Sequence, residues 1–288
     1  MENDQERLLV EASLAGNSDA LAELLASVKD SVFNLSLRML GNVFDAEDAT
    51  QEILLKAMTN LSSFKQYSRF STWVYRIAIN YLINNQKKRS FKEKLTFDLM
   101  AEDLEQSIPV TDENYFGLEE DELAEELKLS CTNIMLQCLS PQDRCVFILG
   151  TMFKMNSQLA GGLLEMTPEA YRKKLSRTRK RMGSFLSTHC GVAGGSCECK
   201  KRIPFAIQQK RLNPSQLDYS ALKKSKLRTI FHQKQNMEFL DEQTLLFETL
   251  SHYQSTFDPQ QFLKELLGSQ QLSELTQEDG LYDLQKNL

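Results

Sequence analysis

The sequence predicts an all-α protein, and three observations on its 288 residues support this class. Leu, Ala, Glu, Lys and Gln, which favour helices, dominate the composition. Apolar residues recur at three- and four-residue steps, whereas alternating β-branched runs are scarce. No proline before residue 109 interrupts the periodic segments. We expect two helical domains at residues 1–95 and 126–187, an acidic linker at 96–125, and a mostly helical C-terminal extension at 188–288.

The composition excludes several classes of protein. Hydrophobic residues make up 41% and charged residues 25%, as in ordinary soluble proteins. The most strongly apolar run, residues 145–153, is much shorter than the roughly 20 residues of a membrane helix. The acidic first residues lack the apolar core of a secretory signal. Six cysteines are too few for a disulfide scaffold, so we expect a cytoplasmic protein without membrane insertion.

The first domain contains an acidic helix. A helix is predicted over residues 18–39, with its cap within 17–19 and its end at Gly41. Asp45 can cap the next helix, whose acidic first turn suits the helix dipole. Asp48 and Glu52 follow at helical spacing on the same face, bordered by Gln51. Such a stripe can dock a basic partner helix; the alternative is a solvated surface.

The third helix of this domain follows an aromatic loop. Ser71 can cap it, after a loop at 62–70 that contains Phe64, Tyr67 and Phe70. One helix face combines aromatic rings with amides, and the helix ends in basic residues: the face comprises Trp73, Ile77, Asn80, Tyr81 and Asn84. Stacking surfaces, amides and cations are what unstacked single-stranded bases require. The alternative is an ordinary hydrophobic core.

The second domain follows a strongly acidic stretch, because residues 98–127 hold twelve Asp and Glu and no Lys or Arg. We interpret the first half of this stretch as a flexible linker. Ser140-Pro141 and Thr167-Pro168 each predict a helix start.

Residues 155–182 have the pattern of a helix-turn-helix whose second helix is basic. Arg172 and Lys173 could reach base edges, whereas Arg177, Arg179 and Lys180 are better placed for phosphates. The alternative is a basic amphipathic helix packed on its neighbours.

The extension opens with a cysteine-rich loop. His189, Cys190, Cys197 and Cys199 could bind zinc, although a loop of free thiols is the alternative. Residues 200–234 then carry ten basic residues and one acid, and two amphipathic patterns follow at about 239–254 and 259–267. The extension could fold back on the chain, contact DNA, or mask the DNA-binding domains. The chain has no Gly-rich phosphate loop and no HExxH motif, so we do not expect an enzyme.

Taken in order, these motifs resemble the bacterial RNA polymerase sigma factors. The resemblance rests on the acidic helix, the aromatic loop, FSTWVYRIAINYLINNQKKR, the acidic linker, LSPQDRCVFILG and TPEAYRKKLSRTRKRM. The chain looks like the extracytoplasmic-function (ECF) group of the sigma-70 family, which keeps two of the larger family's domains. The resemblance covers about residues 8–90 and 126–186. The cysteine-rich segment also resembles C-terminal extensions on some sigma factors of this group.

The resemblance implies a role for each motif, with core RNA polymerase and promoter DNA as partners. The resemblance also allows an anti-sigma factor as a further partner, without deciding whether one exists. The acidic helix would dock on the polymerase clamp through Asp45, Asp48, Gln51 and Glu52. The −10 promoter element would be bound by Phe64, Tyr67, Arg69, Trp73, Tyr75, Asn80, Asn84, Lys87 and Lys88. The −35 element would be bound by Glu169, Arg172, Lys173, Ser176, Arg177, Arg179 and Lys180. The linker would run through the polymerase towards the RNA exit path.

The sequence departs from the family pattern at the helix-turn-helix. Leu159 stands where the family usually has glutamate, and Glu165 replaces the usual turn glycine. Gly161 and Gly162 each weaken a helix by roughly 1 kcal/mol relative to alanine. Asn84 lies near a position where aspartate is common.

The sequence therefore predicts a sigma factor that binds core polymerase, recognises −35 and −10 elements and promotes initiation. The alternative is a stand-alone helix-turn-helix regulator. The aromatic segment argues against it, because a protein that binds only duplex DNA needs no base-stacking residues there.

Overall fold

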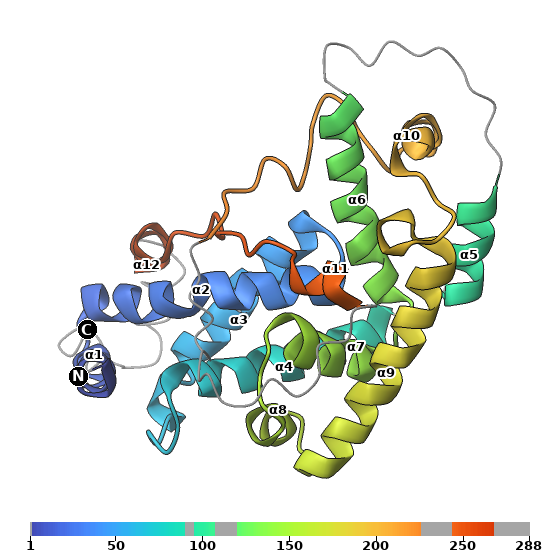
Figure 1. The fold of residues 1–288 in the computed structure, drawn as a ribbon. Coiled ribbons are helices and arrows are strands. Elements are labelled where there is room, and N and C mark those ends of the chain that lie inside the picture. Colours follow the sequence, from blue (N-terminus) through green and yellow to red (C-terminus); the bar gives the residue numbers. More distant parts are fainter. Residues whose placement is uncertain (1, 90–94, 107–119, 226–243, 268–288) are drawn as a thin grey trace.

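The computed structural model describes residues 2–89, 95–106, 120–225 and 244–267. Within these ranges the chain forms helices joined by turns and extended segments, with two isolated backbone bridges and no sheet (Figure 1). The predicted all-α class is confirmed. No helix in the described part combines the length and apolar character needed to cross a membrane.

The first group of helices surrounds α2. It comprises α1 (Glu2–Leu14), α2 (Ser18–Leu40), α3 (Val43–Thr59), the 3-10 turn η1 (Leu61–Ser63) and α4 (Phe70–Arg89). Helix α2 contacts α1, α3 and α4. Most of its residues from Val28 onward are buried, because α3, α4, α6 (Glu120–Gln137) and α12 (Pro259–Leu267) pack against it.

The second group carries the predicted helix-turn-helix. It comprises α6 (Glu120–Gln137), α7 (Pro141–Phe147), the π-helical turn η2 (Ile148–Met152), α8 (Ser157–Leu163) and α9 (Pro168–His189). The caps predicted at Ser140 and Thr167 are present, since each side chain accepts a hydrogen bond from a main-chain N–H in the first turn.

The linker and extension are partly folded onto these groups. Helix α5 (Phe97–Glu105) lies within the stretch predicted to be flexible, where Thr96 caps it and Phe97 packs on Phe185 of α9 at 4.9 Å between ring centres. The described extension contains short helices joined by irregular segments: η3 (Gly191–Ala193), α10 (Cys199–Gln208), α11 (Leu245–Glu248) and α12 (Pro259–Leu267).

Two helix starts differ from the prediction. Helix α3 is capped by Asn42, whose side chain accepts from the Asp45 N–H at 2.7 Å, so Asp45 lies in the first turn and is not the cap. At the start of α4, Ser71 is buried, and the Phe70 N–H donates to the carboxylate of Glu6 at 2.8 Å. A side chain from α1 therefore satisfies an N–H that helix ends otherwise leave unpaired.

The two predicted domains share one hydrophobic core. The same cluster of buried residues includes Val10 of α1, Val74 of α4, Phe147 of α7, Leu186 of α9 and Phe247 of α11. Helices α2 and α4 contact α7, and α4 also contacts α8. The aromatic helix therefore lies against the helix-turn-helix domain.

Candidate nucleic-acid interface

The acidic face of α3 points to solvent. Asp48, Gln51 and Glu52 are exposed, and Asp45 is half-buried beside the cap amide of Asn42, which donates to it at 2.8 Å. On the opposite side of α3, a buried row that includes Ile53, Leu54 and Ala57 packs into the core. The face is therefore a row of side chains on a firmly held helix, available to a partner with positive charge.

The aromatic segment divides into buried and exposed residues. Phe64 and Tyr75 are 6% and 3% exposed, and half-buried Trp73 lies 5.3 Å from Phe64 between ring centres. Burial raises the pKa of Tyr75. These three rings support the fold of α4. In this arrangement the three rings therefore lie in or against the hydrophobic core, which is the alternative to a base-binding surface.

Other residues of the predicted −10 surface are accessible. Tyr67 is 96% exposed at the tip of the loop, and Arg69, Asn80 and Asn84 are exposed as well. They offer one aromatic ring, one cation and two amides. The side chains of Lys87 and Lys88 lie outside the described residues.

The helix-turn-helix forms despite its departures from the family pattern. Helix α8 is capped by Asn156 and ends at Leu163, and α9 starts five residues later. A side-chain Cβ on Gly161 would lie 2.8 Å from the carbonyl oxygen of Met166, so glycine permits the close approach of the turn. Glu165 adopts a positive φ of 56°, a conformation that favours glycine.

Helix α9 presents one polar face to solvent. Most of the residues predicted for the −35 surface are exposed: Glu169, Arg172, Lys173, Ser176, Arg177 and Lys180. Tyr171 anchors the opposite face, where its hydroxyl donates to the Val146 carbonyl at 3.0 Å. Lys173 pairs with Glu169 at 2.8 Å, and Arg172 donates to Ser157 Oγ at 2.9 Å. These contacts hold two cations beside the turn.

Arg179 differs from its neighbours on α9. Its guanidinium is half-buried and donates to Thr151 Oγ1 at 3.0 Å and to the Gly150 carbonyl at 3.1 Å. It ties α9 to η2 in this arrangement. The phosphate contact predicted for it would require these two hydrogen bonds to break.

The cysteine-rich loop brings thiols of the extension near α6. The main chains of Cys190 and Cys197 form an isolated bridge, and a Cβ on Gly191 would overlap the Cys197 carbonyl. Burial raises the pKa of the Cys131 thiol, and the nearby thiols Cys190, Cys197 and Cys199 raise it further. The sequence does not predict that Cys131 lies near this loop, because the two are almost 60 residues apart along the chain.

None of these cysteines is in a disulfide. Among the described residues, no three His, Cys, Asp or Glu side chains are arranged to hold a metal ion. Zinc at His189, Cys190, Cys197 and Cys199 therefore stays a prediction, which metal analysis of the purified protein would test.

Comparison with known proteins relates this arrangement to a family. Residues 24–91, which span most of α2 and all of α3 and α4, match Sigma-70 region 2. ECF RNA polymerase sigma factor SigW of Bacillus subtilis is 45% identical over 74 residues, or 26% of this chain and 40% of that protein. ECF RNA polymerase sigma factor SigE of Mycolicibacterium smegmatis is 25% identical over 168 residues, or 58% and 62%. The chain thus spans about half the length of the first relatives it matches.

Two further comparisons cover more of a relative. RNA polymerase sigma factor CnrH of Cupriavidus metallidurans is 23% identical over 188 residues, or 64% of this chain and 95% of that protein. The solved structure of CnrH in complex with the cytosolic domain of CnrY has a TM-score of 0.46 and 20% identity, covering 64% of this chain and 97% of the other.

Proposed function

We propose that this chain is an ECF sigma factor and that it directs bacterial core RNA polymerase to promoters in the cytoplasm; the region 2 match and the similar proteins support this. One observation carries the proposal. The region 2 match falls on the helices that expose both the acidic face of α3 and the polar residues beside the aromatic loop. A binding subunit of this kind needs partners and DNA but no catalytic group of its own.

The acidic face of α3 would bind the polymerase. Asp48 and Glu52 lie one turn apart, with Gln51 able to donate or accept a hydrogen bond beside them. A basic helix of the partner would meet two carboxylates at once. Complementary charge of this kind raises the rate of encounter and fixes the orientation of docking.

Promoter DNA would meet two separate surfaces. The exposed face of α9 would enter the major groove, with Arg172 and Lys173 near base edges and Arg177 and Lys180 on phosphates. In the loop before α4, Tyr67 could stack on an unpaired base, while Asn80 and Asn84 in the second half of α4 form hydrogen bonds to bases. An anti-sigma partner stays a prediction of the family resemblance.

Run-off transcription tests the proposal. Purified core polymerase would be combined with the full chain on fragmented genomic DNA from the source organism. We expect discrete transcripts that need this protein, and Glu52→Arg should reduce their yield at least tenfold by reversing charge on the docking face. Glu23→Arg is the matched control, because Glu23 is an exposed acid on α2.

The outcomes separate the two functions considered. Loss of transcripts with Glu52→Arg but not with Glu23→Arg would support docking through α3. Absence of any transcript, together with duplex DNA binding by the protein alone, would overturn the proposal in favour of a stand-alone regulator.

A further inference from the structure

Residues 244–258 of the extension cross both helical domains, and we call this segment the strap. It begins at α11, beside η2 of the second domain, and continues along α2 of the first domain to α12 (Figure 1). It therefore joins two groups of helices that are also connected through the linker.

At its first end the strap is anchored to the second domain. Phe247 is 1% exposed, and its ring meets Phe147 of α7 edge-on at 5.1 Å. The neighbouring carboxylate of Glu248, which is largely buried, pairs with Lys154 at 2.7 Å. One apolar contact and one ion pair thus fix α11 beside η2.

Further along, polar side chains of α2 bind the main chain of the strap. The amide of Asn34 donates to the Tyr253 carbonyl at 2.7 Å and accepts from the Tyr253 N–H at 2.9 Å. Arg38 donates to the Ser251 carbonyl at 2.8 Å. Both side chains are almost fully buried. This pattern of side chains paired with extended main chain is a way of holding a peptide segment.

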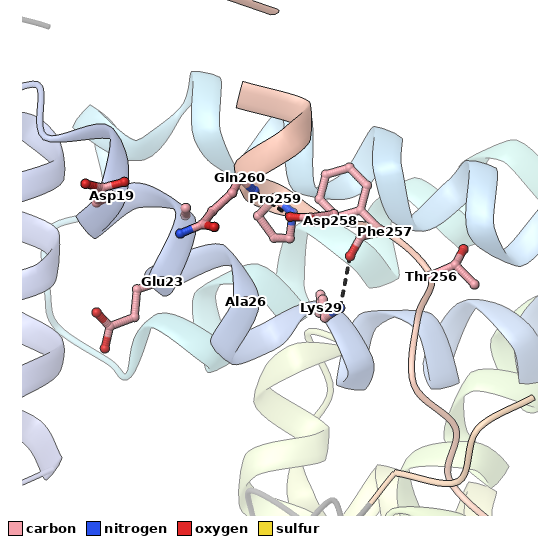
Figure 2. Close-up of a pocket in the computed structure, with 10 residues that line it drawn as sticks. Asp19, Glu23, Ala26, Lys29, Thr256, Phe257, Asp258, Pro259 and Gln260 are labelled. Carbon is pink, nitrogen blue, oxygen red and sulfur yellow. Dashed lines mark hydrogen bonds between the residues drawn. The ribbon is translucent and has the colours of Figure 1, made fainter. Parts of the chain in front are cut away.

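The strap also reaches α3 and the middle of α2. Glu47, which lies next to the proposed docking residue Asp48, accepts hydrogen bonds from Ser255 Oγ at 2.7 Å and from the Thr256 N–H at 2.9 Å. Lys29 donates to the Phe257 carbonyl at 2.9 Å, beside a cavity lined by α2, the end of the strap and the start of α12 (Figure 2).

The interface is suited to release. Its partners on α2 and α3 are amide, guanidinium, ammonium and carboxylate groups, which water can satisfy once the strap has left. Interfaces between parts of a chain that move relative to each other are more polar than permanent cores. The main apolar anchors are Phe247 and Tyr253, which are 1% and 2% exposed.

The closed arrangement is too small for simultaneous promoter contacts. A compact chain of this length has a radius of gyration of about 19 Å and is roughly 50 Å across. The −35 and −10 elements are named for positions 25 base pairs apart, which is about 85 Å along B-form DNA. Helices α4 and α9, which belong to one packed body here, must therefore separate to reach both elements.

We propose that the strap is an autoinhibitory contact: while it lies on α2, it holds the two DNA-binding domains together, and promoter recognition requires its release. This inference rests on the proposed sigma-factor function. It gives the extension one of the three roles considered from the sequence, which is masking of the DNA-binding domains. It assigns that role to residues 244–258.

Substitutions at the two anchors test the proposal in the full chain. Phe247→Ser combined with Tyr253→Ala should increase the radius of gyration of the free protein, measured by X-ray scattering. At limiting protein, run-off transcript yield should rise about threefold or more. Leu245→Ser is the control, because Leu245 lies in the same short helix but is 50% exposed. Circular dichroism would confirm that helix content is retained.

A charge-reversal pair tests the same contact without disturbing the core. Lys154→Glu places a second carboxylate beside Glu248, and we expect it to open the protein and raise transcript yield about twofold. Adding Glu248→Lys should restore both values.

Three results would overturn the proposal. They are an unchanged radius of gyration in the anchor variant, an opened protein that transcribes no better than the original, and a failure of the charge swap to reverse the effect. If no variant directs transcription and the original chain does not either, the proposed function fails. Scattering alone then decides whether the strap holds the domains together.

Discussion

Arg144 shows how one residue can join several helix ends. Its buried guanidinium donates to the carbonyls of Leu136, Gln137 and Leu139 at the end of α6, and to that of Met39 near the end of α2. The last carbonyls of a helix lack partners within it, and a cation there also suits the helix dipole. Burial lowers the pKa of Arg144 to about 10, which still leaves it charged at neutral pH.

Replacing Arg144 should therefore be costly. We expect Arg144→Met to lower the free energy of unfolding by about 3 kcal/mol, because several buried carbonyls would lose a charged donor. Urea denaturation followed by circular dichroism would measure the change. Arg177→Met, at an exposed position on α9, should stay within about 0.5 kcal/mol of the original chain. Equal effects of the two substitutions would refute this role for Arg144.

The sequence could not reveal this role. LSPQDRCVFILG predicts a helix start at Ser140, because a cap and its N–H are neighbours in the chain. The acceptor at Met39 is 105 residues from Arg144 and becomes a neighbour only through packing. The nearness of Cys131 to the cysteine-rich loop has the same origin.

At the scale of elements, local signals predicted most helix ends. Asn17, Gly41 and Thr167 act where the sequence places them, since each completes hydrogen bonds within its own turn. The sequence does not predict helix α5, because the many acidic residues around it hide the helical spacing of Phe97 and Met100. These two side chains are the buried residues of α5.

The pattern at residues 239–254 predicted a helix that the structure shows only at Leu245–Glu248, within the part described from residue 244. The N–H groups of Tyr253 and Ser255 donate to Asn34 and Asp30 of α2. Partners from a distant element thus replaced the hydrogen bonds of a continuing helix, and no local pattern encodes them.

The strap should respond to acid through His252. This ring lies 5.6 Å from Phe153 of the second domain, and its pKa is lowered first by burial and then by the charge of Arg38. A released histidine has a pKa near 6.5, so the released strap binds more protons than the docked strap below that pH. Docking is therefore fully favoured above about pH 6.5 and is weakened as the pH falls below it.

Hydrogen exchange of the strap amides, corrected for the intrinsic effect of pH, would measure this release. Between pH 7.5 and 5.5 we expect protection of residues 250–256 to decrease in the original chain. His252→Phe keeps an aromatic ring but cannot be protonated, so its protection should change much less. Identical pH dependence in both proteins would exclude His252 as the responsible group.

Across the whole molecule, opposite charges in the sequence become contacts between the linker and the extension. Asp103 of α5 pairs with Arg202 at 3.3 Å and with Arg211 at 2.7 Å, and Lys200 pairs with Asp121 at 2.5 Å. The sequence shows an acidic linker followed by a basic block but not that they meet. The family resemblance implies that the linker would run through the polymerase, and in that case these ion pairs would break on binding.

The shared core makes a prediction for the molecule as a whole. Separate domains on a flexible linker would unfold independently, whereas here one cluster of buried residues continues from α1 through α7 to α11. We therefore expect a single thermal transition in the free protein, with equal calorimetric and van't Hoff enthalpies. Phe247→Ser should lower the melting temperature and separate this transition into two, because it weakens the contact of the strap with α7. Two transitions in the original chain would show that the domains unfold independently and that the shared core does not couple them.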